Sequence, residues 1–73
     1  SDSKKAIEFV KSYLDKPEFK ETVCLSLFEI CKQLNISEPE VIETLKHVEK
    51  ITANKKLKEE INDLIKGLVV LRH

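Results

Sequence analysis

Apolar residues recur three or four positions apart along most of the chain, a spacing that predicts amphipathic helices. In the first stretch they are Ala6, Ile7, Val10 and Leu14, with Phe9 and Tyr13 four apart beside them. The sequence DKPE at 15–18 follows. Proline disfavours helix at the residue before it and suits the first turn of a new helix, which Asp15 or Lys16 would cap. We therefore predict a first helix that ends before Pro17 and a short helical segment that carries Phe19.

Two capping-box patterns of the form S-x-x-E lie eleven residues apart in the middle of the chain, at 26–29 and 37–40. Such a box satisfies the free amides at a helix start. They predict one helix from Ser26 to about Leu34, a turn at 35–37, and a second helix with proline in its first turn. The buried stripe of this second helix is predicted to be Val41, Leu45, Val48 and Ile51. The β-branched run at 22–25 fits either a helix end or a short strand.

A last helix is predicted after position 51, where Thr52 or Asn54 can supply its cap. Its apolar positions are Leu57, Ile61, Leu64, Ile65 and Leu68. Gly67 is expected to end this helix, which leaves 68–71 as a strand or a fraying turn. The fold class is therefore all-α, a small bundle of about four helices with at most one or two very short strands. Residues 1–73 form a single domain, and the absence of methionine suggests that it is excised from a larger protein.

Charge restricts the classes of partner. Lysine and arginine number 13, aspartate and glutamate also 13, so the net field favours neither nucleic acid nor an anionic membrane. No run approaches the roughly 18 apolar residues of a membrane-spanning helix, and no signal peptide is visible. We expect an intracellular protein that does not bind membranes.

The residues of an active or metal site are missing from the pattern. Cys24 and Cys31 lie among apolar neighbours without a CxxC motif, which is typical of reduced core thiols. Together with His47 and His73 they match none of the usual zinc-ligand spacings. No nucleophile with its base, carboxylate pair or phosphate loop is apparent either. We predict neither a cofactor nor catalysis.

The stretch from position 30 to 41 resembles the helix-turn-helix and winged-helix superfamily. The resemblance rests on Ile30, Cys31, Leu34, Asn35, Ile36, Ser37 and Val41. A small residue allows two short helices to cross closely, and an aliphatic residue in the turn plugs the core. Cys31 and Ile36 fit these two roles. Asn35 replaces the usual glycine, and asparagine tolerates a left-handed backbone. A plain helical hairpin in a bundle is the alternative.

In this superfamily the second helix reads DNA with its N-terminal residues. By position these residues would be Ser37, Glu38, Pro39, Ile42, Glu43 and Lys46. Glutamates at 38, 40 and 43 would face phosphates, and repulsion should win at physiological salt. An isoleucine with a polar rim is instead typical of a protein interface. We therefore expect a non-catalytic protein-docking module with the interface residues Glu38, Ile42, Glu43, Lys46 and His47.

Two rival functions stay open. A nucleic-acid-binding domain would contact phosphates through Lys46, Lys50, Lys55, Lys56 and Lys58. A homodimer would pair the apolar run Val69-Val70-Leu71. The chain is also weakly similar to the C-terminal domain of the Slx nuclease scaffold subunit and to the N-terminal bundle of S-II type elongation factors. That resemblance implies a place in a larger DNA-transaction or transcription protein, and hence in the nucleus.

Overall fold

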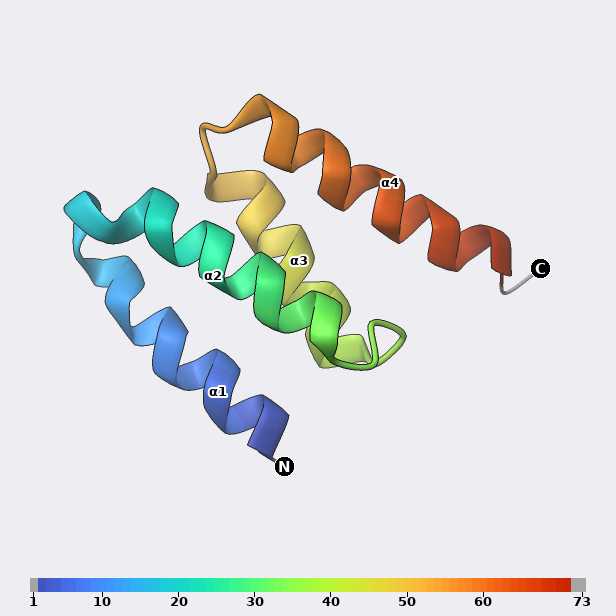
Figure 1. The fold of residues 1–73 in the computed structure, drawn as a ribbon, viewed down its shortest axis with the longest axis horizontal. Coiled ribbons are helices and arrows are strands. Elements are labelled where there is room, and N and C mark those ends of the chain that lie inside the picture. The colour runs from blue at the N-terminus through green and yellow to red at the C-terminus, as the bar shows by residue number, and fades with distance from the viewer. Residues whose placement is uncertain (1, 72–73) are drawn as a thin grey trace.

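The computed structural model of the chain describes residues 2–71, with side chains described for residues 4–68 (Figure 1). Its elements are α1 (Asp2–Lys11), the 3₁₀ turns η1 (Ser12–Asp15) and η2 (Pro17–Phe19), α2 (Lys20–Gln33), α3 (Pro39–Ile51) and α4 (Lys55–Leu71). Every element between residues 2 and 71 is helical, which confirms the all-α prediction. None of the helices in this part of the chain is long and apolar enough to cross a membrane.

The connection from α1 to α2 is built around Pro17, as predicted. Lys16 has an extended backbone, with φ −104° and ψ 108°, which is the conformation favoured before proline. Its amide donates to the Tyr13 carbonyl at 3.2 Å, and the Phe19 amide donates to the Lys16 carbonyl at 3.0 Å. Lys16 occupies the cap position of η2, but no side chain caps this turn. The reversal places α1 and α2 side by side in opposite directions (Figure 1).

The prediction that a helix starts at Ser26 is wrong. α2 begins at Lys20 and continues through Ser26 to Gln33, so residues 22–25 are helix rather than strand. Val23, Leu27 and Cys31, spaced four apart, are all buried on one face of this helix. Burial of such a continuous stripe outweighs the free energy of about 1 kcal/mol that a serine cap contributes.

The turn between α2 and α3 lies where it was predicted, but its chemistry differs. Asn35 Oδ1 accepts from the Ser37 amide at 3.1 Å and from the Ser37 hydroxyl at 2.6 Å, an Asx-type turn. Glu38, not Ser37, occupies the N-cap position of α3, and the Glu38 side chain makes no capping hydrogen bond. No described residue has a positive φ, so Asn35 supports the turn with its side chain and not with a left-handed backbone.

The helix–turn–helix segment places its two key residues as expected. Cys31 is fully buried, and Ile36 is half-buried against the core. α2 packs on both α1 and α3, and α3 packs also on α4. The core consists of Ile7, Val23, Cys24, Leu27, Phe28, Cys31, Val41, Leu45, Val48, Leu57 and Ile61. This geometry suits both the superfamily and a plain hairpin, so the resemblance stays a prediction.

α4 starts as predicted and ends later. Asn54 caps it, because Asn54 Oδ1 accepts from the Leu57 amide at 3.1 Å. The prediction that Gly67 ends the helix is wrong, since α4 continues to Leu71 and residues 68–71 form neither strand nor turn. The side chains of Val69, Val70 and Leu71 lie outside the described residues, and their pairing in a homodimer stays a prediction.

A carboxylate on α2 holds the loop between α3 and α4. Glu21 Oε1 accepts from the Thr52 hydroxyl at 2.5 Å, and Oε2 accepts from the Ala53 amide at 2.9 Å. The Thr52 hydroxyl in turn accepts from the Asn54 amide at 3.1 Å. These bonds favour the charged form, so the Thr52 hydroxyl first and the Ala53 amide second lower the pKa of Glu21 below its ordinary value.

We predict that Glu21→Gln lowers the free energy of unfolding by about 1 kcal/mol at neutral pH. The two donors bond different oxygens of Glu21, and the NH2 group of glutamine cannot accept either bond, while partial exposure of the site limits the loss. A carboxylate with a lowered pKa stabilises the fold above its unfolded-state pKa and loses that effect as the pH falls through the folded-state pKa. The difference between wild type and variant should therefore shrink below the ordinary value of 4.5. Urea unfolding at several pH values measures it.

Glu29→Gln is the matched control. Glu29 pairs with Lys32 at 2.8 Å within one helix, and its side chain is 61% exposed. Its removal should cost only a few tenths of a kcal/mol. Equal losses for the two variants would contradict the special role of Glu21.

Candidate functional site

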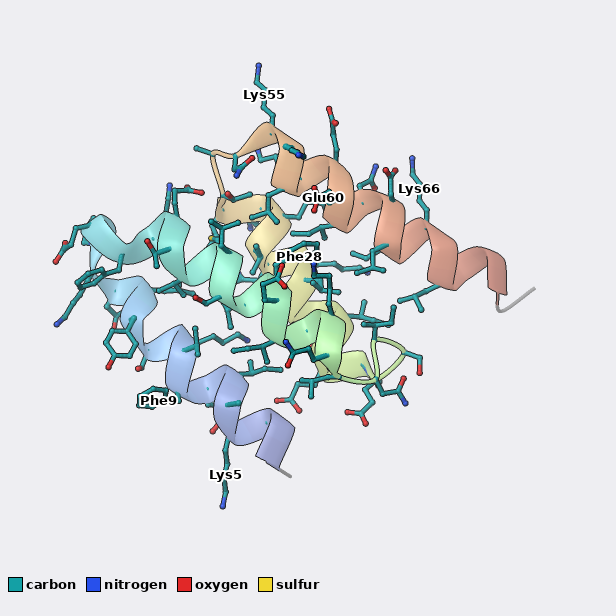
Figure 2. All side chains as sticks on the ribbon, viewed as in Figure 1. Lys5, Phe9, Phe28, Lys55, Glu60 and Lys66 are labelled. Atoms are coloured by element: carbon teal, nitrogen blue, oxygen red, sulfur yellow. The ribbon has the colours of Figure 1, made fainter. Side chains whose placement is uncertain are left out.

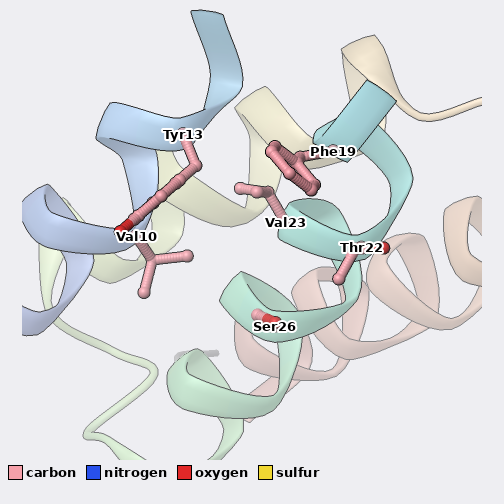
Figure 3. A pocket seen from close by; sticks show the side chains of 6 residues that line it. All are labelled: Val10, Tyr13, Phe19, Thr22, Val23 and Ser26. Carbon is pink, nitrogen blue, oxygen red and sulfur yellow. The ribbon is translucent and has the colours of Figure 1, made fainter. Parts of the chain in front are cut away.

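An apolar groove lies between the first part of the chain and α2 (Figure 3). Its volume is about 300 Å³, and it is lined by Val10, Tyr13, Phe19, Thr22, Val23 and Ser26. α1 and η1 form one wall, and η2 and α2 form the other. The reversal at Pro17 is what brings Phe19 close to Tyr13 on the facing wall.

Three aromatic side chains form a connected strip, of which Tyr13 and Phe19 also line this groove. The Phe9 and Tyr13 rings meet edge to face with centroids 5.7 Å apart, and the Tyr13 and Phe19 rings do so at 6.5 Å. All three are exposed, Phe9 at 67%, Tyr13 at 41% and Phe19 at 42%. Phe9 lies on the side of α1 away from α2 (Figure 2). Aromatic rings in this number on one surface are typical of binding sites rather than of scattered surface residues.

The groove carries no charge. None of its six lining residues is Asp, Glu, Lys, Arg or His, although 36% of the chain is Asp, Glu, Lys or Arg. Tyr13, Thr22 and Ser26 are the lining residues that carry a hydroxyl group. Depletion of charge around aromatic residues is the composition of an interface centre. Such a surface suits an apolar ligand with a few hydrogen-bonding groups.

The residues predicted for docking from the sequence all belong to the start and outer face of α3. Glu38 is the cap residue, while Glu43, Lys46 and His47 are exposed. Ile42, expected as the apolar centre of the interface, is partly buried, so only part of its side chain is open to a partner. Glu43 and His47 are four apart and so share one face of the helix. The α3 face is therefore mostly polar, and its role as an interface stays a prediction.

The lysines of the nucleic-acid alternative come from two helices. Lys46 and Lys50 lie on α3, Lys55, Lys56 and Lys58 lie in the first turns of α4, and all five are exposed. Lys55 points away from the bundle (Figure 2). Lys56 lines a second hollow, of about 220 Å³, together with Glu29 and Glu60. Phosphate binding by these lysines stays a prediction.

The surroundings of the two thiols lower their reactivity. Cys24 and Cys31 are free and fully buried. Burial raises the pKa of both thiols, that of Cys31 to about 11. A buried thiol with a raised pKa is a poor nucleophile and a poor metal ligand. Of the two histidines, His47 is exposed on α3 and His73 lies outside the described residues. In the described part of the chain, no three His, Cys, Asp or Glu gather as a metal site would need.

The clustering of aromatic residues in the sequence indicates the groove, although helical periodicity alone does not predict it. The chain has three phenylalanines and one tyrosine, and all but Phe28 lie between positions 9 and 19. Helical spacing predicts Phe9 and Tyr13 in the first helix and Phe19 in the next helical segment. Phe9 and Tyr13 meet through their four-residue spacing, and the reversal at Pro17 brings Phe19 next to Tyr13.

Neither models of protein families nor curated proteins nor solved structures give a match to this chain. Function is therefore inferred from the residues of the chain and the geometry of the site.

We predict that the two thiols of the folded chain react slowly with a thiol reagent at mildly alkaline pH. Raising the pKa of Cys31 from 9.0 to about 11 reduces its thiolate fraction roughly 100-fold, and burial limits access further. Labelling followed by mass spectrometry measures the rate, with the chain unfolded in urea as control. Equal rates in the two states would contradict the burial of both sulfur atoms.

We predict that Phe9→Ala lowers the free energy of unfolding by less than about 1 kcal/mol, because its ring is mostly exposed and packs edge-on against Tyr13. Leu45→Ala is the contrasting variant. Leu45 is fully buried, and its truncation should cost about 2–5 kcal/mol. Urea unfolding of both variants gives the two values, and similar losses would show that Phe9 belongs to the core.

Proposed function

We propose that this domain is a non-catalytic protein-docking module on a helix-turn-helix scaffold, and that the groove between α1 and α2 receives the partner. The module would work inside a larger protein of DNA transactions or transcription, as the weak resemblances imply. The observation that carries the docking proposal is the exposed aromatic strip beside an uncharged groove.

The cost of exposing these rings supports the proposal. Roughly 25 cal/mol of hydrophobic free energy is forgone for each Å² of apolar surface left in water. Phe9, Tyr13 and Phe19 are all large and all substantially exposed. The core is complete without them, since its buried residues come from elsewhere on the four helices. A partner that covers the strip would recover this free energy.

The composition of the strip supports a protein partner over a phosphate-bearing one. Aromatic residues are enriched and charged residues depleted at the centres of protein interfaces. Phosphate recognition instead needs lysine or arginine at the contact, and the groove lining has neither. The α3 residues Glu38, Ile42, Glu43, Lys46 and His47 are a second docking surface within the same proposal, with less exposed apolar area.

To test this proposal, peptides that bind the 73-residue chain are selected from a library of displayed random peptides. Selected peptides are then titrated into the ¹⁵N-labelled chain while amide shifts are followed by NMR. We expect shifts at the residues lining the groove. Phe19→Ala should weaken binding at least about fivefold, because truncating an aromatic anchor costs more than about 1 kcal/mol.

Leu25→Ala is the matched control, since Leu25 is 47% exposed, close to the 42% of Phe19, but lines the other hollow. A DNA duplex is titrated in parallel at low and at physiological salt. Failure to select any groove-binding peptide, together with DNA-induced shifts that survive salt, would contradict docking and favour the lysine alternative. Peptide shifts confined to residues 38–47 would move the docking site to α3.

A further inference from the structure

The buried core is divided unequally between the first helix and the other three. Of the core residues, only Ile7 lies on α1, and all the others lie on α2, α3 and α4. Val10 and Leu14 add partly buried side chains, while Phe9 and Tyr13 are exposed. A helix that buries little apolar surface gains little of the free energy that keeps it packed.

Polar interactions are divided in the same way. Within the described part of the chain, no side-chain hydrogen bond or ion pair joins residues 4–19 to residues 20–68. In contrast, Glu21 joins α2 to the loop after α3, and α3 packs on both α2 and α4. Apolar and polar contacts together therefore hold α2, α3 and α4, whereas apolar contacts alone hold the described side chains of α1 and η1.

The junction between these two parts of the molecule offers a pivot. Lys16 is exposed and extended, with φ −104° and ψ 108°, between the turns η1 and η2. Residues at the ends of elements commonly absorb the backbone rotations of a hinge motion. Beside the junction, the groove of about 300 Å³ leaves its two walls incompletely packed. Rotation at Lys16 would carry α1 and η1 away from α2 without breaking the contact of α2 with α3.

The two buried thiols lie near different parts of the molecule. Burial first and the Glu21 carboxylate second raise the pKa of Cys24, and the Thr52 hydroxyl lowers it. Cys24 therefore lies beside the contact between α2 and the α3–α4 loop. Burial raises the pKa of Cys31 to about 11, and the Lys11 ammonium of α1 is the charged group that lowers it. Cys31 therefore lies on the part of α2 that α1 approaches.

From these observations we propose that α1 and η1 form a strap, residues 2–15, that swings away from a body of α2, α3 and α4 while this body stays folded. The closed strap covers Cys31, and the open strap admits solvent and reagents to it. Cys24 stays covered in both states by the α3–α4 loop. Opening exposes apolar surface of α2 to water, so the open state is the minor one. The strap goes beyond the proposed function and does not depend on whether the groove binds a partner.

The first measurement is the rate at which iodoacetamide labels each thiol of the 73-residue chain, at urea concentrations well below unfolding. Tandem mass spectrometry assigns the label, and each rate is divided by that of the same cysteine in the unfolded chain. We expect Cys31 to react at least about 30-fold faster than Cys24, because opening of the strap needs less free energy than global unfolding. The Cys31 rate should also rise less steeply with urea, since opening exposes less surface.

Two matched variants distinguish a strap from a single cooperative unit. Ile7 and Ile61 are both buried isoleucines, one on the strap and one on α4. Ile7→Val should speed the labelling of both thiols roughly two- to tenfold, because the strap is open both in the minor state and in the unfolded chain. Ile61→Val should speed the labelling of Cys24 by a similar factor. It should leave that of Cys31 within about 1.5-fold of wild type, since α4 stays packed when the strap opens.

Amide hydrogen exchange followed by NMR tests whether the strap moves as one piece. We expect the hydrogen-bonded amides of α1 to share one opening free energy and one urea dependence, both smaller than those of α3. Fraying from the chain end would instead give protection that falls steadily toward residue 2.

Equal normalised rates for the two thiols would overturn the strap, and so would equal acceleration of both thiols by Ile61→Val. Graded protection along α1 would overturn its motion as a unit. None of these outcomes bears on the docking proposal, which peptide selection tests separately.

Discussion

One carboxylate links the three larger helices. Glu21 lies near the start of α2 and accepts hydrogen bonds from Thr52 and Ala53, 31 and 32 residues further along the chain. Three residues separate α3 from α4, and Thr52 and Asn54 connect this loop to the cap of α4. Burial of an apolar stripe is non-directional, whereas hydrogen bonds to a carboxylate require their donors at defined positions. The polar network therefore specifies the geometry, and burial of apolar side chains supplies most of the free energy.

The fold and the candidate site draw on different residues of the same helices. α2 buries Val23, Cys24, Leu27, Phe28 and Cys31, and presents Thr22 and Ser26 to the groove from an adjacent face. Val23 serves both purposes, since it belongs to the core and lines the groove. Changes at the aromatic strip can therefore alter binding with little effect on the core. This separation makes surface variants of the domain interpretable.

Most of the helices could be predicted from the sequence, because their signals are local. The ring of Pro17 disfavours helix at the residue before it and suits the first turn of η2. The side chain of Asn54 caps α4. The errors at Ser26 and Gly67 have one cause, since each residue carries a helix-boundary signal that a continuous apolar stripe overrides. The bond from Thr52 to Glu21 joins residues 31 apart and has no local signature.

The candidate site was beyond sequence reasoning for a similar reason. A groove is a property of two facing segments, and periodicity describes one segment at a time. The α3 surface could be proposed from the sequence because all its residues belong to one helix and its start. The groove could not be proposed from the sequence, because its two walls meet only after the chain reverses at Pro17. Clustering of the aromatic residues between positions 9 and 19 is the one trace of it in the sequence.

The two walls of the groove are anchored unequally. α2 contributes five buried side chains, whereas among the described side chains of α1 only Ile7 is fully buried. The hydrogen bonds that Glu21 accepts hold α2 to the α3–α4 loop, on the far side from α1 (Figure 1). A ligand that touches both walls would then clamp the less firmly held helix to the rest of the domain. Occupancy of the groove and the order of the N-terminal helix would be thermodynamically linked, so that affinity depends on how often this helix is already in place.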